Sequence, residues 1–296
     1  MNWCGLLNVD KSPGMTSRQV VDHVQKLVRP QKAGHAGTLD PLASGVLVVC
    51  VGTATRLITR VQQGRKQYVG HFRLGQRSNT DDTDGEVVDG GDWSGITGPM
   101  MEQLLPEFLG TIQQTPPQIS AVKVAGHRAY KLARRGETVE LEPRPVEVFS
   151  IQLTKFELPE FELAIECGSG TYIRSIGRDL GERLGCGAVM SALRRTAIGR
   201  FNLADAVQLA SLDATSLRDA LLPPQAAVAE LPIRQLEPAE VVRIRQGRSV
   251  PWSSIPDPDY KGEVTLVDLA NNMIGIAQPD PMQQQLFPKL VLSALH

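Results

Sequence analysis

The sequence predicts an α+β protein built as two domains, and three observations support this. Stretches of alternating or continuous apolar residues, typical of strands, are interspersed with stretches whose apolar residues recur at helical spacing. The chain has 296 residues, 42% hydrophobic and 21% charged, which is a globular composition and enough length for two domains. From about Leu231 the pattern changes to short strand-like runs and turns.

In the first part of the chain, a strand at 5–9 leads through a turn at 11–14 to a helix that Thr16 or Ser17 can cap and Pro30 ends. Residues 46–51 are continuously apolar and predict a strand buried on both faces, whereas 66–74 alternate. Between them, 53–63 predict a helix capped by Thr53. The polar stretch 76–85 (QRSNTDDTDG) predicts a solvated hairpin, because its acids do not complete a calcium-loop spacing.

The rest of the chain continues this mixture. A helix over 99–108 carries Pro99 in its first turn, 119–124 predict a strand, and 127–134 predict a helix closed by Gly136. Strands at 146–157 and 161–167 precede a helix that Thr171 can cap and that runs to 183. A strand at 196–201 and a helix beginning at 203 follow. The tail predicts a hairpin, 264–269 with 273–277, and a further strand at 289–292.

The stretch KAGHAGTLDPLASG, from Lys32 to Gly45, combines small residues with a single acid, Asp40. Small residues let the backbone pass close to another molecule, and Pro41 biases Asp40 towards an extended or turn-like backbone. A lone carboxylate on such a loop, followed directly by a buried strand, is how a reactive acid is presented. The alternative interpretation is that the Asp-Pro pair only starts a turn.

The sequence of this stretch from His35 to Gly45 resembles the G-T-L-D-P-x-A-x-G catalytic motif of the TruB family of tRNA pseudouridine synthases. Further segments resemble that family: GLLNVDKSPGMTS near the N-terminus, KQY at 66–68, GTYIR at 170–174 and SALRR at 191–195. The first departs from the usual K-P-x-G, since Ser12 takes the proline position and the proline follows as Pro13. Together these matches extend over roughly the first two-thirds of the chain.

The resemblance implies a pseudouridine-synthase fold, with a mixed, mainly antiparallel sheet flanked by helices, over residues 1–228. Members of the family often end in a small β-rich RNA-binding module, the PUA domain, and 229–296 is the candidate for it. The match of this short tail is much weaker, so a stabilising cap is the alternative.

The resemblance also assigns roles to individual residues. It makes Asp40 the catalytic aspartate, with Tyr172 as the candidate base for the C5 proton and Arg174 as the partner that keeps the carboxylate charged and oriented by a forked pair of hydrogen bonds. For the remaining positions it implies stacking on the target base by Tyr68, lining of the base pocket by Leu193, stacking in the vacated space by His35, and structural support of the loop by Lys11. The alternatives are a half-buried strand tyrosine, a backbone-bonded loop histidine and a solvated turn lysine.

Residues 123–135 carry five Lys or Arg residues, no acid, and the interleaved Tyr130. Such a stretch indicates contact with phosphates, and the family places tRNA contacts in this region. The candidate residues are Lys123, Arg128, Lys131 and Arg134. A solvated helix face is the alternative.

Composition limits the other possibilities. The net charge of −1 means that any RNA-binding charge is local, and the four cysteines have no metal-ligand spacing. The absence of a leader-like or membrane-length apolar run predicts a cytoplasmic protein that does not bind membranes, taken to be a monomer. Isomerising uridine requires no redox step or group donor, so no cofactor and no metal are expected.

The predicted function is conversion of the T-loop uridine of tRNA to pseudouridine, with the T arm of tRNA as partner. Two alternatives are an RNA-binding or folding-assistant protein with secondary or lost catalysis, and an unrelated hydrolase with Asp40 as nucleophile. Intact Asp40, Tyr68, Tyr172 and Arg174 argue against lost chemistry. A hydrolase would normally need a second catalytic carboxylate or a set of metal ligands near Asp40, and the sequence near Asp40 contains neither. Whether Asp40 attacks C1′ or first abstracts a sugar proton stays open.

Overall fold

The computed structural model describes residues 3–118, 123–124, 127–128, 141–252 and 260–292. Its main feature is a ten-stranded sheet with the order β14-β1-β3-β12-β4-β11-β10-β7, to which β2 and β13 are added beside β3 and β12. Among the described strands of this sheet, only the pairs β1–β14 and β3–β12 are parallel, so the prediction of a mixed, mainly antiparallel sheet is confirmed. The strands are β1 Gly5–Lys11, β2 Ala33–His35, β3 Ser44–Val51, β4 Lys66–Leu74, β7 Gly110–Gln114, β10 Arg144–Glu157, β11 Glu160–Cys167, β12 Ala188–Ile198, β13 Phe201–Asn202 and β14 Val207–Gln208.

Helices cover this sheet. The α-helices are α1 Ser17–Leu27, α2 Ile58–Gln63, α3 Gly98–Leu104, α5 Ile173–Arg183 and α6 Ala214–Ala220, and the short 3-10 helices are η1 Gly52–Leu57, η2 Leu105–Phe108, η3 Leu203–Asp205, η4 Leu209–Ser211 and η5 Pro224–Val228. Within the described ranges, no helix is long and apolar enough to cross a lipid bilayer.

Several local predictions are wrong. The helix expected at 53–63 begins as the 3-10 helix η1, and the Thr53 hydroxyl contacts Cys4 Sγ at 3.2 Å instead of capping it. Tyr172, not Thr171, is the N-cap residue of α5, and the helix expected from 203 is one 3-10 turn before β14. Residues 127–128 pair with 123–124 as strands β9 (His127–Arg128) and β8 (Lys123–Val124), so a helix does not start there; 119–122, 125–126 and 129–140 lie outside the described residues.

The polar stretch 76–85 is also different from the expected solvated hairpin. β5 (Gln76–Ser78) pairs with β6 (Val87–Asp89), but the turn between them folds inward. Thr80, Asp81 and Asp82 are at most 8% exposed. The two aspartates can be buried because each pairs with an arginine of α5, Asp81 with Arg178 and Asp82 with Arg174.

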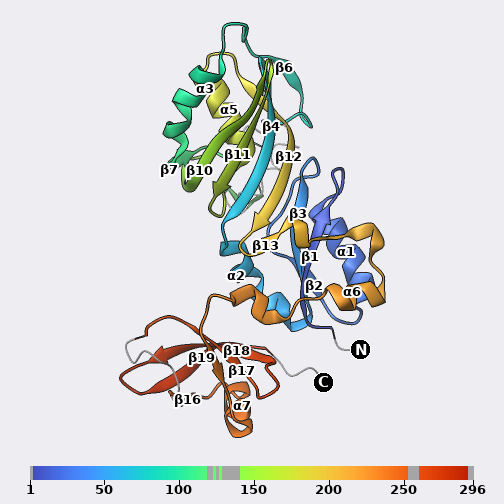
Figure 1. The fold of residues 1–296 in the computed structure, drawn as a ribbon, viewed down its shortest axis with the longest axis vertical. Helices are drawn as coiled ribbons and strands as arrows, with labels where there is room; N and C mark the ends of the chain where they lie inside the picture. Colours follow the sequence, from blue (N-terminus) through green and yellow to red (C-terminus); the bar gives the residue numbers. More distant parts are fainter. Residues whose placement is uncertain (1–2, 119–122, 125–126, 129–140, 253–259, 293–296) are drawn as a thin grey trace.

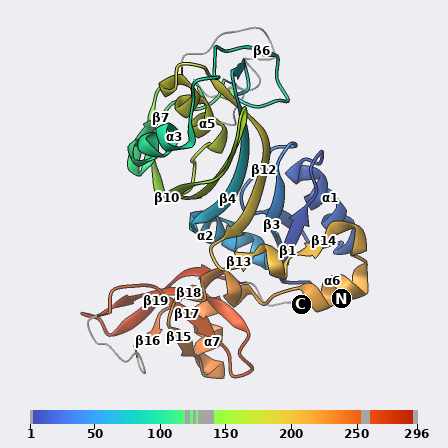
Figure 2. The ribbon, with the colours of Figure 1, turned by 45° about the horizontal axis from the view of Figure 1, so that its top comes forward.

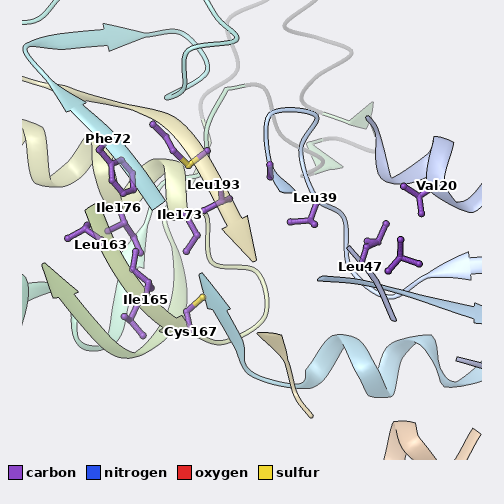
Figure 3. Packing of buried hydrophobic residues seen from close by; sticks show 14 of the residues in the cluster. Val20, Leu39, Leu47, Phe72, Leu163, Ile165, Cys167, Ile173, Ile176 and Leu193 are labelled. Carbon is purple, nitrogen blue, oxygen red and sulfur yellow. The ribbon is translucent and has the colours of Figure 1, made fainter. Parts of the chain in front are cut away.

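The largest hydrophobic core lies on one face of the sheet, under α1 on one side and under α5 on the other (Figure 3). Helix α1 buries Val20 and Val24, and α5 buries Ile176 and Leu180, because these residues recur on one face of each helix. Phe72 of β4 stacks on Phe161 of β11 with ring centroids 5.1 Å apart. This stack packs two neighbouring strands of the same half of the sheet against each other.

A second sheet forms from the C-terminal residues, in the order β15-β17-β18-β19-β16, and confirms the β-rich tail (Figure 1). Its elements are β15 Ile233–Gln235, α7 Pro238–Arg245, β16 Val250–Pro251, β17 Val264–Val267, β18 Met273–Asp280 and β19 Gln285–Val291. Figure 1 and Figure 2 both show this second sheet beside α2. One apolar cluster includes residues of the second sheet and of the first part of the chain, among them Ile276 and Leu57. Arg60 of α2 binds the Glu263 carboxylate at 2.6 Å.

Candidate active site

The loop that carries Asp40 lies where the two halves of the large sheet meet. β3 and β12 share only two register pairs, Arg194 with Ser44 and Arg195 with Gly45. A Cβ on Gly45 would lie 2.2 Å from the carbonyl oxygen of Arg195, so this close approach requires glycine. The loop between β2 and β3 therefore stands at the mouth of the junction.

Hydrogen bonds from the N-terminal segment fix this loop. The Ser17 hydroxyl donates to the carbonyl oxygen of Leu39 at 3.0 Å and accepts from the Leu39 N–H at 2.8 Å. The buried Lys11 donates to the carbonyl oxygens of Ser12, Met15 and Pro41, at 3.0, 2.6 and 3.4 Å. Burial lowers the pKa of Lys11 to about 8, although the nearby Asp40 charge opposes the shift. These contacts support the loop on both sides of Asp40.

Arg174 joins the Asp40 carboxylate to a second carboxylate. Arg174 is 5% exposed. Its Nη2 lies 3.1 Å from Asp40 Oδ2, while Nη1 lies 3.1 Å from Asp82 Oδ2 and donates to the Thr80 carbonyl at 2.8 Å. The expected fork is thus shared between two aspartates. The Asp82 side chain is 4% exposed and that of Asp40 is 39% exposed, so Asp40 is the carboxylate that a substrate can reach.

Neighbouring strands supply the wall beside Asp40. Arg195 of β12 lies in register between Gly45 of β3 and Tyr68 of β4, and its buried guanidinium donates to the carbonyl oxygens of Val46 and Gly37 at 2.7 and 3.2 Å. Burial raises the pKa of the Tyr68 hydroxyl, although the positive charge of Arg195 opposes this shift. Burial also lowers the pKa of Lys66, at the start of the same strand, to about 8. The ring of Tyr68 therefore borders the cleft as a neutral phenol.

A cleft of about 650 Å³ connects these groups. Of the predicted site residues, it is lined by Asp40, Tyr68, Tyr172, Arg174 and Leu193. Lys11 lies behind the loop, and His35 lies on β2 opposite Val49, outside the lining, where burial lowers the pKa of its imidazole. Lys123 and Arg128 lie on β8 and β9, whereas Lys131 and Arg134 fall outside the described residues.

The sequence reasoning missed several residues of the site. Asp82 lies in a stretch that was predicted to be exposed to solvent. Arg195, Arg144 and Gln114 lie on strands, where no local sequence pattern marks them as site residues. The one available signal was the family element around Leu193, which includes Arg195. Ion pairs between residues about ninety positions apart, such as Asp82 with Arg174, leave no local trace in the sequence.

The arrangement offers one reachable carboxylate, oriented by a buried arginine, next to two aromatic side chains in a cleft of nucleotide size. Asp82 is already occupied: its Oδ1 accepts from the Thr80 hydroxyl at 2.6 Å and from the Asp84 N–H at 3.1 Å. Among the described residues that line the cleft, a paired-carboxylate mechanism therefore lacks a second free acid. Across the part of the chain that is described, no three His, Cys, Asp or Glu side chains gather as metal ligands would.

Comparison with known proteins shows which family the chain resembles. Residues 25–173 match the N-terminal domain of the TruB family of pseudouridylate synthases, and residues 174–229 match a tRNA pseudouridylate synthase B C-terminal domain. A protein of Dehalococcoides mccartyi strain 195 described as tRNA pseudouridine synthase B is 40% identical over 280 residues, covering 93% of this chain and 92% of that one. One of Synechococcus sp. strain CC9311 with the same description is 40% identical over 297 residues, covering 98% of both.

Solved structures show the same fold. A chain in the crystal structure of a Cbf5-Nop10-Gar1 complex superposes with a TM-score of 0.73 at 27% identity, covering 98% of this chain and 84% of that one. A chain in an H/ACA RNP bound to a substrate RNA containing 2′-deoxyuridine has the same TM-score at 24% identity, over 98% of this chain and 85% of that one, and shares the fold. By these matches and its own motifs, the chain belongs to the TruB family of pseudouridylate synthases.

Proposed function

We propose that this enzyme converts the T-loop uridine of tRNA, the one that becomes the Ψ of TΨC, to pseudouridine, with Asp40 as the catalytic carboxylate. The observation that carries the proposal is the pairing of Asp40 with the buried Arg174 at the mouth of a cleft bordered by Tyr68, Tyr172 and Leu193. The names of the relatives support the tRNA substrate.

The reaction is an isomerisation. The N1–C1′ bond breaks, the base rotates, C5 bonds to C1′, and the proton on C5 leaves while N1 gains one, so atoms and electrons balance without an oxidant. Asp40 either attacks C1′ or removes a sugar proton first, and its partly exposed side chain is compatible with both. Arg174 fixes the carboxylate, and Tyr172, whose ring lies 6.0 Å from the Arg174 guanidinium carbon, is the group assigned to the C5 proton.

The uridine must leave its loop to reach this carboxylate, because Asp40 lies in a cleft and not on a ridge. The cleft volume of about 650 Å³ suits one extruded nucleotide. In this account the ring of Tyr68 stacks on the base, Leu193 contacts its edge, and His35 stacks in the space that the base vacates. Lys11 supports the loop without touching the substrate.

The body of the tRNA is held elsewhere in this proposal. Lys123, Arg128, Lys131 and Arg134 contact its phosphates, and residues 229–296 act as a PUA-like RNA-binding module docked on the catalytic domain at 1–228. We propose that the protein acts on tRNA as a monomer in the cytoplasm.

The replacement Asp40→Asn tests the proposal. The amide keeps the shape and the contact with Arg174 but cannot act as a nucleophile or base, so turnover should be lost while the tRNA dissociation constant stays within about twofold. Glu160→Gln, at an exposed strand end, is the matched control and should leave turnover unchanged. Substantial turnover by Asp40→Asn, with deamidation excluded by mass spectrometry, would refute Asp40 as the catalytic group.

A further inference from the structure

Two residues at the far edge of the large sheet hold the segment that presents Tyr172. Gln114 ends β7 and Arg144 begins β10, and they face each other in the antiparallel register of the two strands. Both side chains extend to the loop between β11 and α5, residues 168–172. Neither residue belongs to the motifs discussed above.

The Gln114 side chain makes two hydrogen bonds with the backbone of Tyr172. Its Nε2 donates to the Tyr172 carbonyl at 3.0 Å, and its Oε1 accepts from the Tyr172 N–H at 2.8 Å. Gln114 is 0% exposed, so water cannot replace either bond. Because Tyr172 is the N-cap residue of α5, this pair fixes both the tyrosine and the start of the helix that carries Arg174.

Arg144 acts on the same segment from inside the cleft. Its Nη2 donates to the Gly170 carbonyl at 2.7 Å, and its guanidinium carbon lies 5.1 Å from the centroid of the Tyr172 ring. Among the described residues, Arg144 makes no ion pair with a carboxylate, so its charge is directed at the Tyr172 ring and the cleft. A cation over a ring restricts the ring to one orientation.

We propose that Gln114 and Arg144 are positioning residues for the isomerisation, which set the backbone and the ring of Tyr172 relative to Asp40. The proposal rests on the catalytic role assigned to Tyr172 above. Two hydrogen bonds hold the backbone of Tyr172, and the Arg144 guanidinium lies against its ring. Misplacement of a catalytic group by about 1 Å can cost about a hundredfold in rate. Gln114 is not itself among the described residues that line the cleft, so it acts on the site through Tyr172.

The test compares Gln114→Glu and Gln114→Met under single-turnover conditions with excess enzyme on a tRNA transcript. Both should slow the chemical step about ten- to a hundredfold at pH 8, with the tRNA dissociation constant within about twofold of wild type. The Glu deficit, taken as a ratio to wild type at each pH, should shrink as the pH falls, because a protonated carboxyl group regains a donor for the Tyr172 carbonyl. The Met deficit should not change with pH.

Gln113→Glu is the matched control, since Gln113 lies next to Gln114 on β7 with an exposed side chain. It should match wild type at every pH. Arg144→Met should slow the step more than Arg144→Lys, which keeps a cation near the ring. Melting temperatures, measured on each variant at each pH, separate positioning from loss of fold.

The proposal is overturned if both Gln114 variants react at the wild-type rate. It is also overturned if the rate deficits follow the melting temperature or the tRNA affinity of the variants, because Gln114 would then be a structural anchor. Tyr172→Phe separates this outcome from a failure of the proposed function. If Tyr172→Phe turns over at the wild-type rate, the role of Tyr172 itself is wrong. If it is slow while the Gln114 variants are normal, only the positioning role fails.

Discussion

Replacing Arg174 by lysine keeps the positive charge beside Asp40 but removes the geometry of the guanidinium. In the structure one nitrogen serves Asp40 and the other serves Asp82 and the Thr80 carbonyl. A lysine ammonium is a single point, so it cannot hold both carboxylates at 3.1 Å. We expect it to settle nearer the fully buried Asp82 and to leave Asp40 free to rotate.

The magnitude follows from the bond that is lost. A hydrogen bond to a charged group contributes about 1.5 to 3 kcal/mol, which corresponds to a rate factor of roughly ten to 150. The Asp40 side chain is 39% exposed, so water screens part of this interaction and the lower end applies. We therefore expect Arg174→Lys to slow the chemical step about tenfold. Arg174→Ala should be worse, because it also leaves the buried Asp82 charge without its partner.

Single-turnover kinetics with enzyme in excess separates this step from binding and product release. The tRNA dissociation constant should change little, because the body of the RNA is held elsewhere. Arg183→Lys, at the exposed end of the same helix, is the control and should behave as wild type. If Arg174→Ala modifies tRNA at the wild-type single-turnover rate, Arg174 is only a structural ion-pair partner and the reasoning is refuted.

Three further predictions follow from the same contacts. Asp82→Asn keeps the bonds within its turn but removes one charge from Arg174, so the single-turnover rate should fall severalfold; an unchanged rate would show that Asp82 serves folding alone. Burial lowers the pKa of Lys11 from 10.5 to about 8. Between pH 8 and 10.5 the folded state therefore binds fewer protons than the unfolded state, so the contribution of Lys11 to the free energy of unfolding should rise over this range. Urea titrations should show a smaller rise in Lys11→Met than in wild type; some rise remains in the variant because burial also lowers the pKa of Lys66 to about 8. Removing the charges of Arg128, Lys131 and Arg134 together should weaken tRNA binding and reduce the log–log salt slope by about one unit or less per lost phosphate contact; an unchanged slope would favour a solvated face.

Much of the fold was predictable from local patterns. β4 was predicted with the bounds Lys66–Leu74 that the structure has, because its alternation reflects one buried and one open face. Helix α1 was predicted from its apolar spacing and from Thr16, which caps it with a capping box. Strong periodicity and capping chemistry are properties of a segment itself, so the sequence alone displays them.

The misses share a different cause, which is dependence on distant residues. The first part of β12 was not predicted as a strand, because irregularities between Met190 and Ala192 and between Arg195 and Ala197 interrupt its alternation. Asp81 and Asp82 look like solvent-exposed turn residues, yet ion pairs with Arg178 and Arg174 allow them to be buried. Burial raises the pKa of Asp81, which Arg178 and the Ser175 hydroxyl oppose.

For the site, the sequence predicted that Asp40 and Arg174 belong together, and they lie 3.1 Å apart. It did not reveal the sharing of Arg174 with Asp82, nor the contacts of Gln114 with Tyr172. Both depend on how α5 packs against strands that are far away in the chain. The chemical roles of these residues stay predictions until the variants are measured.

The most direct test of the account is mass spectrometry of an unmodified tRNA transcript after incubation with the purified protein, with pseudouridine located by fragment. The account predicts that one uridine in the T loop is converted to pseudouridine by the wild-type protein without any added cofactor, and that Asp40→Asn leaves it unconverted. A T-loop uridine that stays unmodified across several tRNAs, or equal conversion by Asp40→Asn, would contradict it.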